Sequence, residues 1–219
     1  MPSSKPSPRP ASDAELLDAW RDGDAEAGEA LYLRHYRPVA RFFRNKVGPD
    51  RVADLIQETF VASVEGRERI HDSSRFRAYL LRIAYRVLCR HLRETYRRPE
   101  SELDSISVAD VDPTPSTIIA RAQEQRLLLE GLRVIPVNYQ TVLELHYWEE
   151  LTTNEIAEVL GIPPGTARSR LQRAREALEA AMASIARSRE VLDSTLTRLD
   201  DWAADCGREL AKTGNSSPA

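Results

Sequence analysis

Apolar residues recur every three or four positions through most of this 219-residue chain. That spacing places them on one side of an α-helix, and the alternation expected of a β-strand does not occur. In the first half of the chain, the pattern predicts helices over 12–21, 24–47, 51–65 and 75–97. The sequence therefore predicts an all-α fold that begins with a helical bundle.

The same spacing gives each predicted helix an inward side. Tyr32 is expected to face the core from the second helix, and Val61 and Val64 are expected to do so from the third. Cys89 lies on the apolar side of the fourth helix, where we expect it to be a small core residue.

A change of composition divides the chain. Residues 99–116 contain three prolines, several acids and few large apolar side chains, which is typical of a flexible acidic linker. Beyond it, the helical pattern resumes over 118–132 and again from Pro136. We expect two helical domains joined by the linker and flanked by other segments: a disordered tail 1–11, domain 12–98, linker 99–116, domain 117–182, a helical extension 183–212 and a disordered tail 213–219.

The segment from Leu151 to Leu178 has the signals of two short helices joined by a tight turn. Thr152 and Glu155 have the spacing of a capping box at the start of the first helix. Gly161 follows the last apolar residue, where a left-handed conformation ends many helices. The run Pro163-Pro164-Gly165 stops continuation, and we expect Thr166 to cap the second helix.

The second of these helices separates its apolar side from its polar side. Ala167, Leu171, Ala174 and Leu178 fall on one side, which we expect to be buried. The remaining surface has no acid before Glu176, and its residues are Arg168, Ser169, Arg170, Gln172, Arg173 and Arg175. A helix-turn-helix of this kind places its second helix in the major groove of DNA.

Charge is unevenly distributed along the chain. The formal net charge of −3, from 31 basic and 34 acidic residues, argues by itself against nucleic acid as a partner. However, 67–98 contains ten arginines and three acids, 166–175 contains four arginines and no acid, and 99–117 contains five acids and no base. Two basic surfaces separated by an acidic connector are suited to a phosphate backbone. The alternative is that both are ordinary solvated helix surfaces.

Other chemistry finds little support in the sequence. The two cysteines and four histidines have no metal-ligand spacing, and there is no phosphate loop or nucleophile–base pattern. We therefore expect no metal, no cofactor and no enzymatic activity. The first 12 residues lack the apolar core of a signal peptide, and no apolar run approaches the roughly 18 residues of a membrane helix. A cytoplasmic protein without membrane insertion is expected.

Three motifs in this order resemble a known family. They are DLIQETF at 54–60, FRAYLLRIA at 76–84, and IPVNYQTVLELHYWEELTTNEIAEVLGIPPGTARSRLQRARE at 135–176. The chain resembles a bacterial RNA polymerase sigma factor of the extracytoplasmic-function (ECF) group of the sigma-70 family, over about 12–182. The resemblance implies that the first domain is sigma region 2 and the second is sigma region 4. It further implies core RNA polymerase and promoter DNA as partners and promoter-specific initiation of transcription as the function.

The resemblance assigns polymerase docking to the helix that contains DLIQETF. Asp54, Gln57 and Glu58 lie at spacings of three and four and therefore share one side of this helix. A surface with carboxylates suits a basic partner helix and is unsuited to DNA. The alternative is an ordinary solvated surface.

The resemblance assigns promoter opening to the next helix and the loop before it, which trap an extruded base of the start-proximal element. Cations and rings at the matching positions are Arg67, Arg69, His71, Phe76, Arg77, Tyr79, Arg82 and Arg86. Stacking and pocket contacts offset the cost of unstacking the base. Phe76 and Tyr79 are equally suited to a supporting role in the core, so both alternatives stay open for them.

The chain departs from the family pattern in this helix. The family commonly has Trp, Asn and Asp where this chain has Tyr79, Arg86 and Arg90. Arg86 occupies a position expected to help recognise the start-proximal element. The sequence of that element is therefore not predicted.

The resemblance assigns the −35 element to the recognition helix. Arginine can bond bidentately to guanine in the major groove. By position, Arg168, Ser169, Gln172 and Arg173 are candidates for base contacts. Thr166, Arg170 and Arg175 are candidates for phosphate contacts, which position the helix without specifying sequence.

The extension 183–212 has a heptad-like apolar stripe from Ile185 to Leu210, accompanied by Trp202. It either packs back on the second domain, or it docks against an anti-sigma factor or the first domain. The rival to the sigma function is a helix-turn-helix activator, which would bind duplex DNA without polymerase. The sequence does not identify the promoters, the inducing signal or whether an anti-sigma factor exists.

Overall fold

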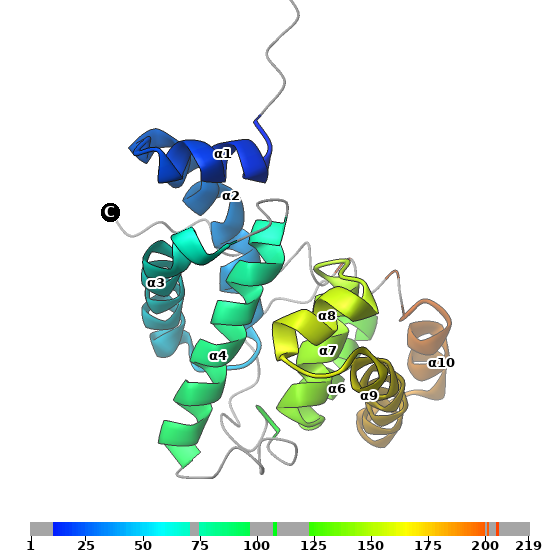
Figure 1. Ribbon diagram of the computed structural model, residues 1–219. Coiled ribbons are helices and arrows are strands. Elements are labelled where there is room, and N and C mark those ends of the chain that lie inside the picture. Colours follow the sequence, from blue (N-terminus) through cyan, green and yellow to red (C-terminus); the bar gives the residue numbers. More distant parts are fainter. Residues whose placement is uncertain are drawn as a thin grey trace, which may run out of the picture.

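The computed structural model describes residues 11–70, 75–96, 107–108, 123–199, 201 and 205. Its first unit is a helical bundle in which α3 packs between α2 and α4, and α1 packs on α2 (Figure 1). The bounds of its elements are α1 Asp13–Arg21, α2 Ala25–Arg44, α3 Pro49–Gly66, the 3-10 turn η1 Arg67–Arg69 and α4 Phe76–Tyr96. These four α-helices confirm the predicted bundle.

The second unit contains the helix-turn-helix and the helices that support it. Both α7 and α8 pack on the long helix α9, and α6 lies between α9 and α10. The bounds are α6 Gln123–Val134, α7 Val137–Tyr147, α8 Thr153–Leu160, α9 Pro164–Ile185 and α10 Arg189–Thr197. In the described parts of the chain no β-strand forms, although Ser107 and Pro136 make an isolated antiparallel bridge. The prediction of an all-α protein with two helical units is confirmed.

No helix among the described residues is both long enough and apolar enough to cross a membrane. The predicted tails 1–11 and 213–219 and the predicted linker 99–116 lie almost entirely outside the described residues.

Local signals place the helix ends. Ser12 caps α1 in a reciprocal capping box with Glu15, and the side chain of Asp24 accepts hydrogen bonds from two backbone amides at the start of α2. α3 starts instead at Pro49, whose missing N–H is not needed in a first turn. Between these ends, Phe43, Leu81 and Cys89 are buried, which confirms the core position predicted for Cys89.

The expectation that Tyr32, Val61 and Val64 face the core is wrong. Their exposed fractions are 40%, 50% and 43%. The described neighbours of α3 within the bundle are α2, α4 and η1, which together cover only part of its circumference. The apolar stripe of α3 is therefore wider than its covered side, and Tyr32 meets the stripe at its edge, with its ring 4.5 Å from that of Phe60.

The carboxyl-terminal extension packs back on the second unit. After Ile185 the helix ends, and α10 then lies against α6 and α9 (Figure 1). Leu192, Leu196 and Leu199 pack against the core, and Ser194 donates to Glu124 of α6 at 3.2 Å. The predicted stripe is thus interrupted after Ile185 rather than carried by one straight helix. Trp202, Cys206 and Leu210 lie outside the described residues.

Candidate nucleic-acid interface

The helix-turn-helix is built from local contacts in α8 and the turn that follows. The backbone N–H of Thr152 donates to the Glu155 carboxylate at 2.8 Å, and the N–H of Glu155 donates to the Thr152 hydroxyl at 3.3 Å. These hydrogen bonds lower the pKa of Glu155. Gly161 then takes a left-handed conformation with φ of 68°, which an L side chain rarely adopts. The predicted capping box and glycine terminus are both confirmed.

The second helix starts earlier than expected. α9 begins at Pro164 with Pro163 as its N-cap residue, so Thr166 lies inside the first turn. The predicted capping role of Thr166 is therefore wrong. A proline has a helical φ and lacks the N–H that a cap would satisfy, which allows the helix to start at Pro164 itself.

α9 buries one side and exposes the other. Ala167, Leu171, Ala174 and Leu178 are buried, as predicted. On the other side, Thr166, Arg168, Gln172 and Arg173 are exposed, while Ser169 and Arg170 are partly buried. The exposed residues begin in the first turn of the helix, which is the part that such helices insert into the major groove.

Arg175 lies apart from this exposed group. Its guanidinium donates to the Tyr147 hydroxyl at 3.0 Å, lies 3.3 Å from Nε2 of His146, and sits above the Tyr147 ring. It therefore ties α9 to the end of α7 and holds the recognition helix on its support. The sequence held no sign of this contact, because the two partners lie 28 and 29 residues away.

The predicted docking residues do share one side of α3. Asp54 and Gln57 are exposed, and Glu58 is partly covered. Asp54 accepts from Arg51 at 3.1 Å, while Glu58 pairs with Arg90 of α4. The exposed side chains of Val61 and Val64 extend the same side of the helix. The surface thus combines carboxylates with apolar groups.

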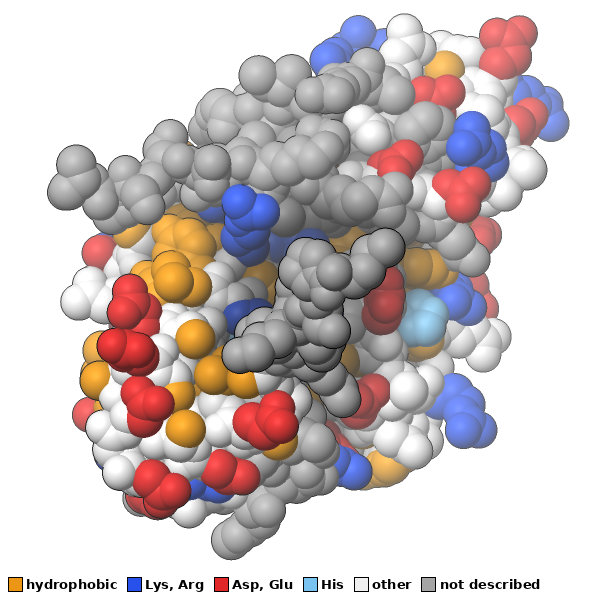
Figure 2. Space-filling view, turned by 90° about the horizontal axis from the view of Figure 1, so that it is seen from above, with side chains coloured by type: hydrophobic (Ala, Val, Ile, Leu, Met, Phe, Trp, Pro, Cys, Tyr) orange, Lys and Arg blue, Asp and Glu red, His pale blue; other side chains and the backbone are white. Residues whose placement is uncertain are grey.

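Acidic side chains also gather over the α1 side of the first unit, where few basic ones are visible (Figure 2). Both α1 and α2 carry acids in their first turns. A surface of this sign repels a phosphate backbone, so this side of the first unit is unsuited to DNA.

The predicted start-proximal residues divide into three groups. Phe76 is buried, with 1% exposed, so it takes the supporting role rather than the contact role. Arg82 and Arg86 are exposed on α4. Arg67 is partly buried beneath Trp20, whereas the side chain of Arg69 and the whole of His71 lie outside the description.

Tyr79 is partly buried, and its hydroxyl packs against Gly66 at the end of α3. A Cβ atom added to Gly66 would lie 2.1 Å from that hydroxyl oxygen. A larger residue at this position would therefore displace the Tyr79 ring. Tyr79 therefore fixes the start of α4 against the end of α3.

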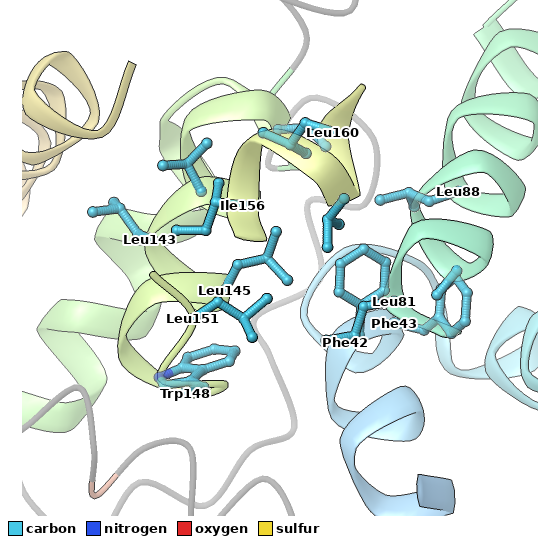
Figure 3. Close-up of a cluster of buried hydrophobic side chains, with 14 of the residues drawn as sticks. Phe42, Phe43, Leu81, Leu88, Leu143, Leu145, Trp148, Leu151, Ile156 and Leu160 are labelled. Atoms are coloured by element: carbon cyan, nitrogen blue, oxygen red, sulfur yellow. The ribbon is translucent and has the colours of Figure 1, made fainter. Parts of the chain in front are cut away.

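Cations at and beside the start of α4 are bound by carboxylates of the second unit. Arg77 donates to Glu149 at 2.5 Å, Arg41 of α2 donates to the same carboxylate, and Arg75 donates to Glu158 of α8 at 2.5 Å. α8 packs along α4, and Leu145 and Leu151 face Phe42 and Leu81 across the boundary (Figure 3).

A buried ion pair lies beside this boundary. Nζ of Lys46 donates to the Phe42 carbonyl oxygen at 2.8 Å and pairs with Glu144 of α7. Gln140 donates to Glu144 at 2.8 Å and to the Asn45 carbonyl oxygen at 2.9 Å. Burial lowers the pKa of Lys46 and raises that of Glu144, and the opposite charge of each partner acts against that effect. Sequence reasoning missed this pair, whose members are 98 residues apart.

In the described part of the chain, no group of three or more His, Cys, Asp or Glu side chains is placed to hold a metal ion. Cys89 is a free, buried thiol.

Comparison with known proteins identifies the family. The family "Sigma-70 region 2" matches residues 31–98, and "Sigma-70, region 4" matches residues 125–178. The chain is 29% identical to the ECF RNA polymerase sigma-E factor of Haemophilus influenzae over an alignment of 178 residues, which covers 77% of this chain and 94% of that protein. It is 26% identical to the protein of the same name from Escherichia coli K12, over 77% of this chain and 93% of that protein.

The fold is also similar to a solved structure, that of CnrH in complex with the cytosolic domain of CnrY. The TM-score is 0.58 at 25% identity, covering 80% of this chain and all of that one. The two matched regions together span more than half of the chain and coincide with its two helical units. The chain belongs to the ECF group of the sigma-70 family and is a sigma factor that directs promoter-specific initiation of transcription by core RNA polymerase.

Proposed function

We propose that the exposed side of α9 binds the −35 promoter element. Arg168, Ser169, Gln172 and Arg173 contact base edges, and Thr166 and Arg170 contact phosphates. Arg175 holds α9 on Tyr147, and its positive charge attracts the phosphates of the same element. The observation that carries this proposal is an exposed surface without acids in the first turns of a helix-turn-helix, where major-groove contacts are made.

α4 and the turn before it bind the start-proximal element. Arg82 and Arg86 provide exposed cations, Arg77 lies in the first turn of α4, and Arg67, Arg69 and His71 precede this helix in the sequence. Tyr79 and Phe76 fix the end of the helix at which the extruded base is held. The departure at Arg86 replaces the family's amide with a cation, so we expect it to favour phosphate contact over base recognition.

Asp54, Gln57 and Glu58 dock on core polymerase. Charge reversal tests this role: Asp54→Lys lowers retention of the chain on immobilised core enzyme, while circular dichroism shows unchanged helix content. Asp193→Lys on α10 is the matched control, because it reverses an equally exposed carboxylate on the other unit. Equal retention of both variants would contradict the docking role.

The decisive experiment for the whole assignment is transcription in vitro. Core enzyme plus this chain initiates at a cognate promoter, and neither initiates alone. The chain by itself binds duplex promoter DNA weakly. A helix-turn-helix activator gives the opposite result, with a clear footprint of the isolated protein and no requirement for it as a polymerase subunit.

A protein partner of the anti-sigma type is supported by the fold relationship, because CnrH is held in a complex with the cytosolic domain of CnrY. We place the chain and this partner in the cytoplasm, where promoter DNA and polymerase are found. The test is copurification from the native host of a stoichiometric partner whose addition abolishes transcription in vitro. A chain that purifies alone and fully active from uninduced cells would contradict it.

A further inference from the structure

The boundary between the two units places carboxylates of one unit on cations of the other. Glu149 is 4% exposed in its side chain and accepts from both Arg41 and Arg77, and Glu158 accepts from Arg75. We propose that this boundary is an autoinhibitory clasp, in which region 4 carboxylates occupy cations at and beside the start of α4 and exclude promoter DNA until the units separate. This inference rests on the proposed role of α4.

The clasp is electrostatic in part. A carboxylate and a phosphate accept hydrogen bonds from the same guanidinium donors with similar geometry. While Glu149 accepts from Nη2 of Arg77, that donor is not available to a phosphate, and the carboxylate neutralises the charge that would attract one. Glu158 has the same relation to Arg75, although that pair is more exposed and hence weaker.

The clasp is also steric. α8 lies along α4, and Leu145 and Leu151 pack toward Phe42 and Leu81 (Figure 3). Asn138 accepts from the Tyr85 hydroxyl at 3.0 Å further along α4. A DNA strand cannot reach this side of α4 without displacing α7 and α8. Arg82 lies at the edge, where it lines an open groove together with Asn154 and Pro163.

The boundary also has features that suit it to opening. The fully buried Lys46 and Glu144 both recover favourable hydration when the units separate, so the pair holds the boundary less firmly than well-packed apolar residues would. In addition, Oε1 of Gln140 and Oγ1 of Thr141 are buried without a hydrogen-bond partner among the described residues. A contact with these properties is specific in its geometry and still suited to opening.

The test uses two variants of the full chain that act in opposite directions. Glu149→Gln combined with Glu158→Gln releases the α4 cations. The free chain should then bind a labelled single-stranded oligonucleotide, carrying the start-proximal non-template sequence, about tenfold more tightly and with a steeper salt dependence. Glu190→Gln combined with Asp201→Asn is the control, since it removes the same charge from the surface of the second unit.

The opposing variant replaces the buried pair with apolar residues, Lys46→Met with Glu144→Leu, and touches no residue assigned to DNA or polymerase. It should slow initiation several-fold and leave the chain compact in small-angle X-ray scattering. DNA binding by the released variant that equals the control would overturn the clasp, as would faster initiation by the apolar variant. If Arg82→Ala and Arg86→Ala leave promoter opening by the complete polymerase unchanged, it is the role of α4 that fails.

A separate observation concerns Arg21 of α1, which lies before the residues that match sigma-70 region 2. Its guanidinium donates to the carbonyl oxygen of Arg67 at 3.1 and 3.3 Å and also to that of Ile70, while Asp18 holds it at 2.9 Å. Trp20, the preceding residue, lies against the guanidinium of Arg67. Two neighbouring residues of α1 thus contact the turn η1 and hold it in place.

We infer that Arg21 is a positioning residue for promoter opening. Carbonyl groups at the end of a helix lack partners within it, and a planar guanidinium satisfies several of them in one fixed arrangement. Arg21 thereby fixes the turn that carries Arg67, and so acts on DNA only through the proposed role of Arg67.

Arg21→Lys keeps the charge and removes the planar fork. Initiation from a duplex promoter should fall about tenfold, while binding to core enzyme is unchanged and initiation from a template with a pre-opened bubble is largely restored. An equal loss on both templates, or no loss on either, would overturn the inference. If Arg67→Ala opens the duplex promoter normally, the proposed role of Arg67 fails instead.

Discussion

The helices α9 and α4, for which we propose contacts with the −35 and start-proximal elements, have similar compositions and different surroundings. Both are rich in arginine, and α9 exposes Arg168 and Arg173 to solvent. On α4, Arg77 is bound by a glutamate from the other unit. Two arginines of α9 are thus open to solvent, whereas α4 has both an arginine held by the other unit and the exposed Arg82 and Arg86.

The difference follows from the position of each helix. α9 packs its buried stripe on α6, α7 and α8, and its opposite side has solvent in front of it. α4 lies at the centre, with α2 and α3 on one side and α8 on another. Availability for DNA is therefore decided by tertiary contacts, which composition does not reveal.

The largest expected effect is on promoter binding, and it differs between two arginines of α9. Arg173→Ala should relax discrimination at one base pair by about 1–3 kcal/mol, because a bidentate contact to guanine is lost. Arg175→Ala should weaken binding to all sequences alike and lower the stability of the second unit by roughly 1 kcal/mol, because its hydrogen bond to Tyr147 is lost. A promoter-mutation series and thermal melts measure the two effects. The same profile for both variants would contradict the division.

A smaller effect tests the contrast between the open and the covered surface. In the free chain, Arg170→Ala should reduce the slope of log affinity against log salt concentration by about 0.9, as one phosphate contact is lost from duplex DNA. Arg77→Ala should leave that slope unchanged, because Glu149 already occupies its guanidinium. With core polymerase present, both variants should weaken promoter binding. Equal slopes for the two variants in the free chain would mean that α4 is not covered in solution.

Local chemistry made much of this fold predictable. The capping boxes at Ser12 and Thr152 and the left-handed Gly161 involve residues three positions apart or a single residue, so the sequence contains the whole interaction. Thr166 shows the limit of such signals. Both the hydroxyl of Thr166 and the fixed φ of the prolines before it favour a helix start. The prolines determined the start, which lies at Pro164.

The rest depends on contacts between distant residues. The exposure of Val61 could not be inferred, because periodicity shows an apolar side without showing how much of it neighbours cover. The partner of Arg77 lies 72 residues further along the chain, and nothing around either residue points to the other. Candidate DNA residues could therefore be predicted by motif, whereas their accessibility could not.

The smallest expected effect is a pH dependence of stability, which arises from a histidine that packs against α4. His35 is buried against Phe76, with Nε2 at 2.8 Å from Asp13, and Arg34 and Arg77 are the cations that act on it. Burial lowers the pKa of His35 below its ordinary value of 6.5, more than Asp13 raises it, and Arg77 and Arg34 add to the lowering. On acidification the unfolded chain therefore binds a proton before the folded chain does.

The contribution of His35 to stability is consequently full above pH 6.5 and is lost as the pH falls from there through its lower folded pKa. The free energy of unfolding should decline with a slope of at most about 1.4 kcal/mol per pH unit for this group. His91, whose pKa is lowered chiefly by burial and then by Arg51, adds a decline of the same sign. Urea titrations between pH 7.5 and 5.5 should show a shallower decline for His35→Gln than for the parent chain, with the share of His91 remaining. A decline of unchanged slope would show that His35 has the same pKa in the folded and the unfolded chain. The packing of His35 against α4 would then contribute nothing to the pH dependence of stability.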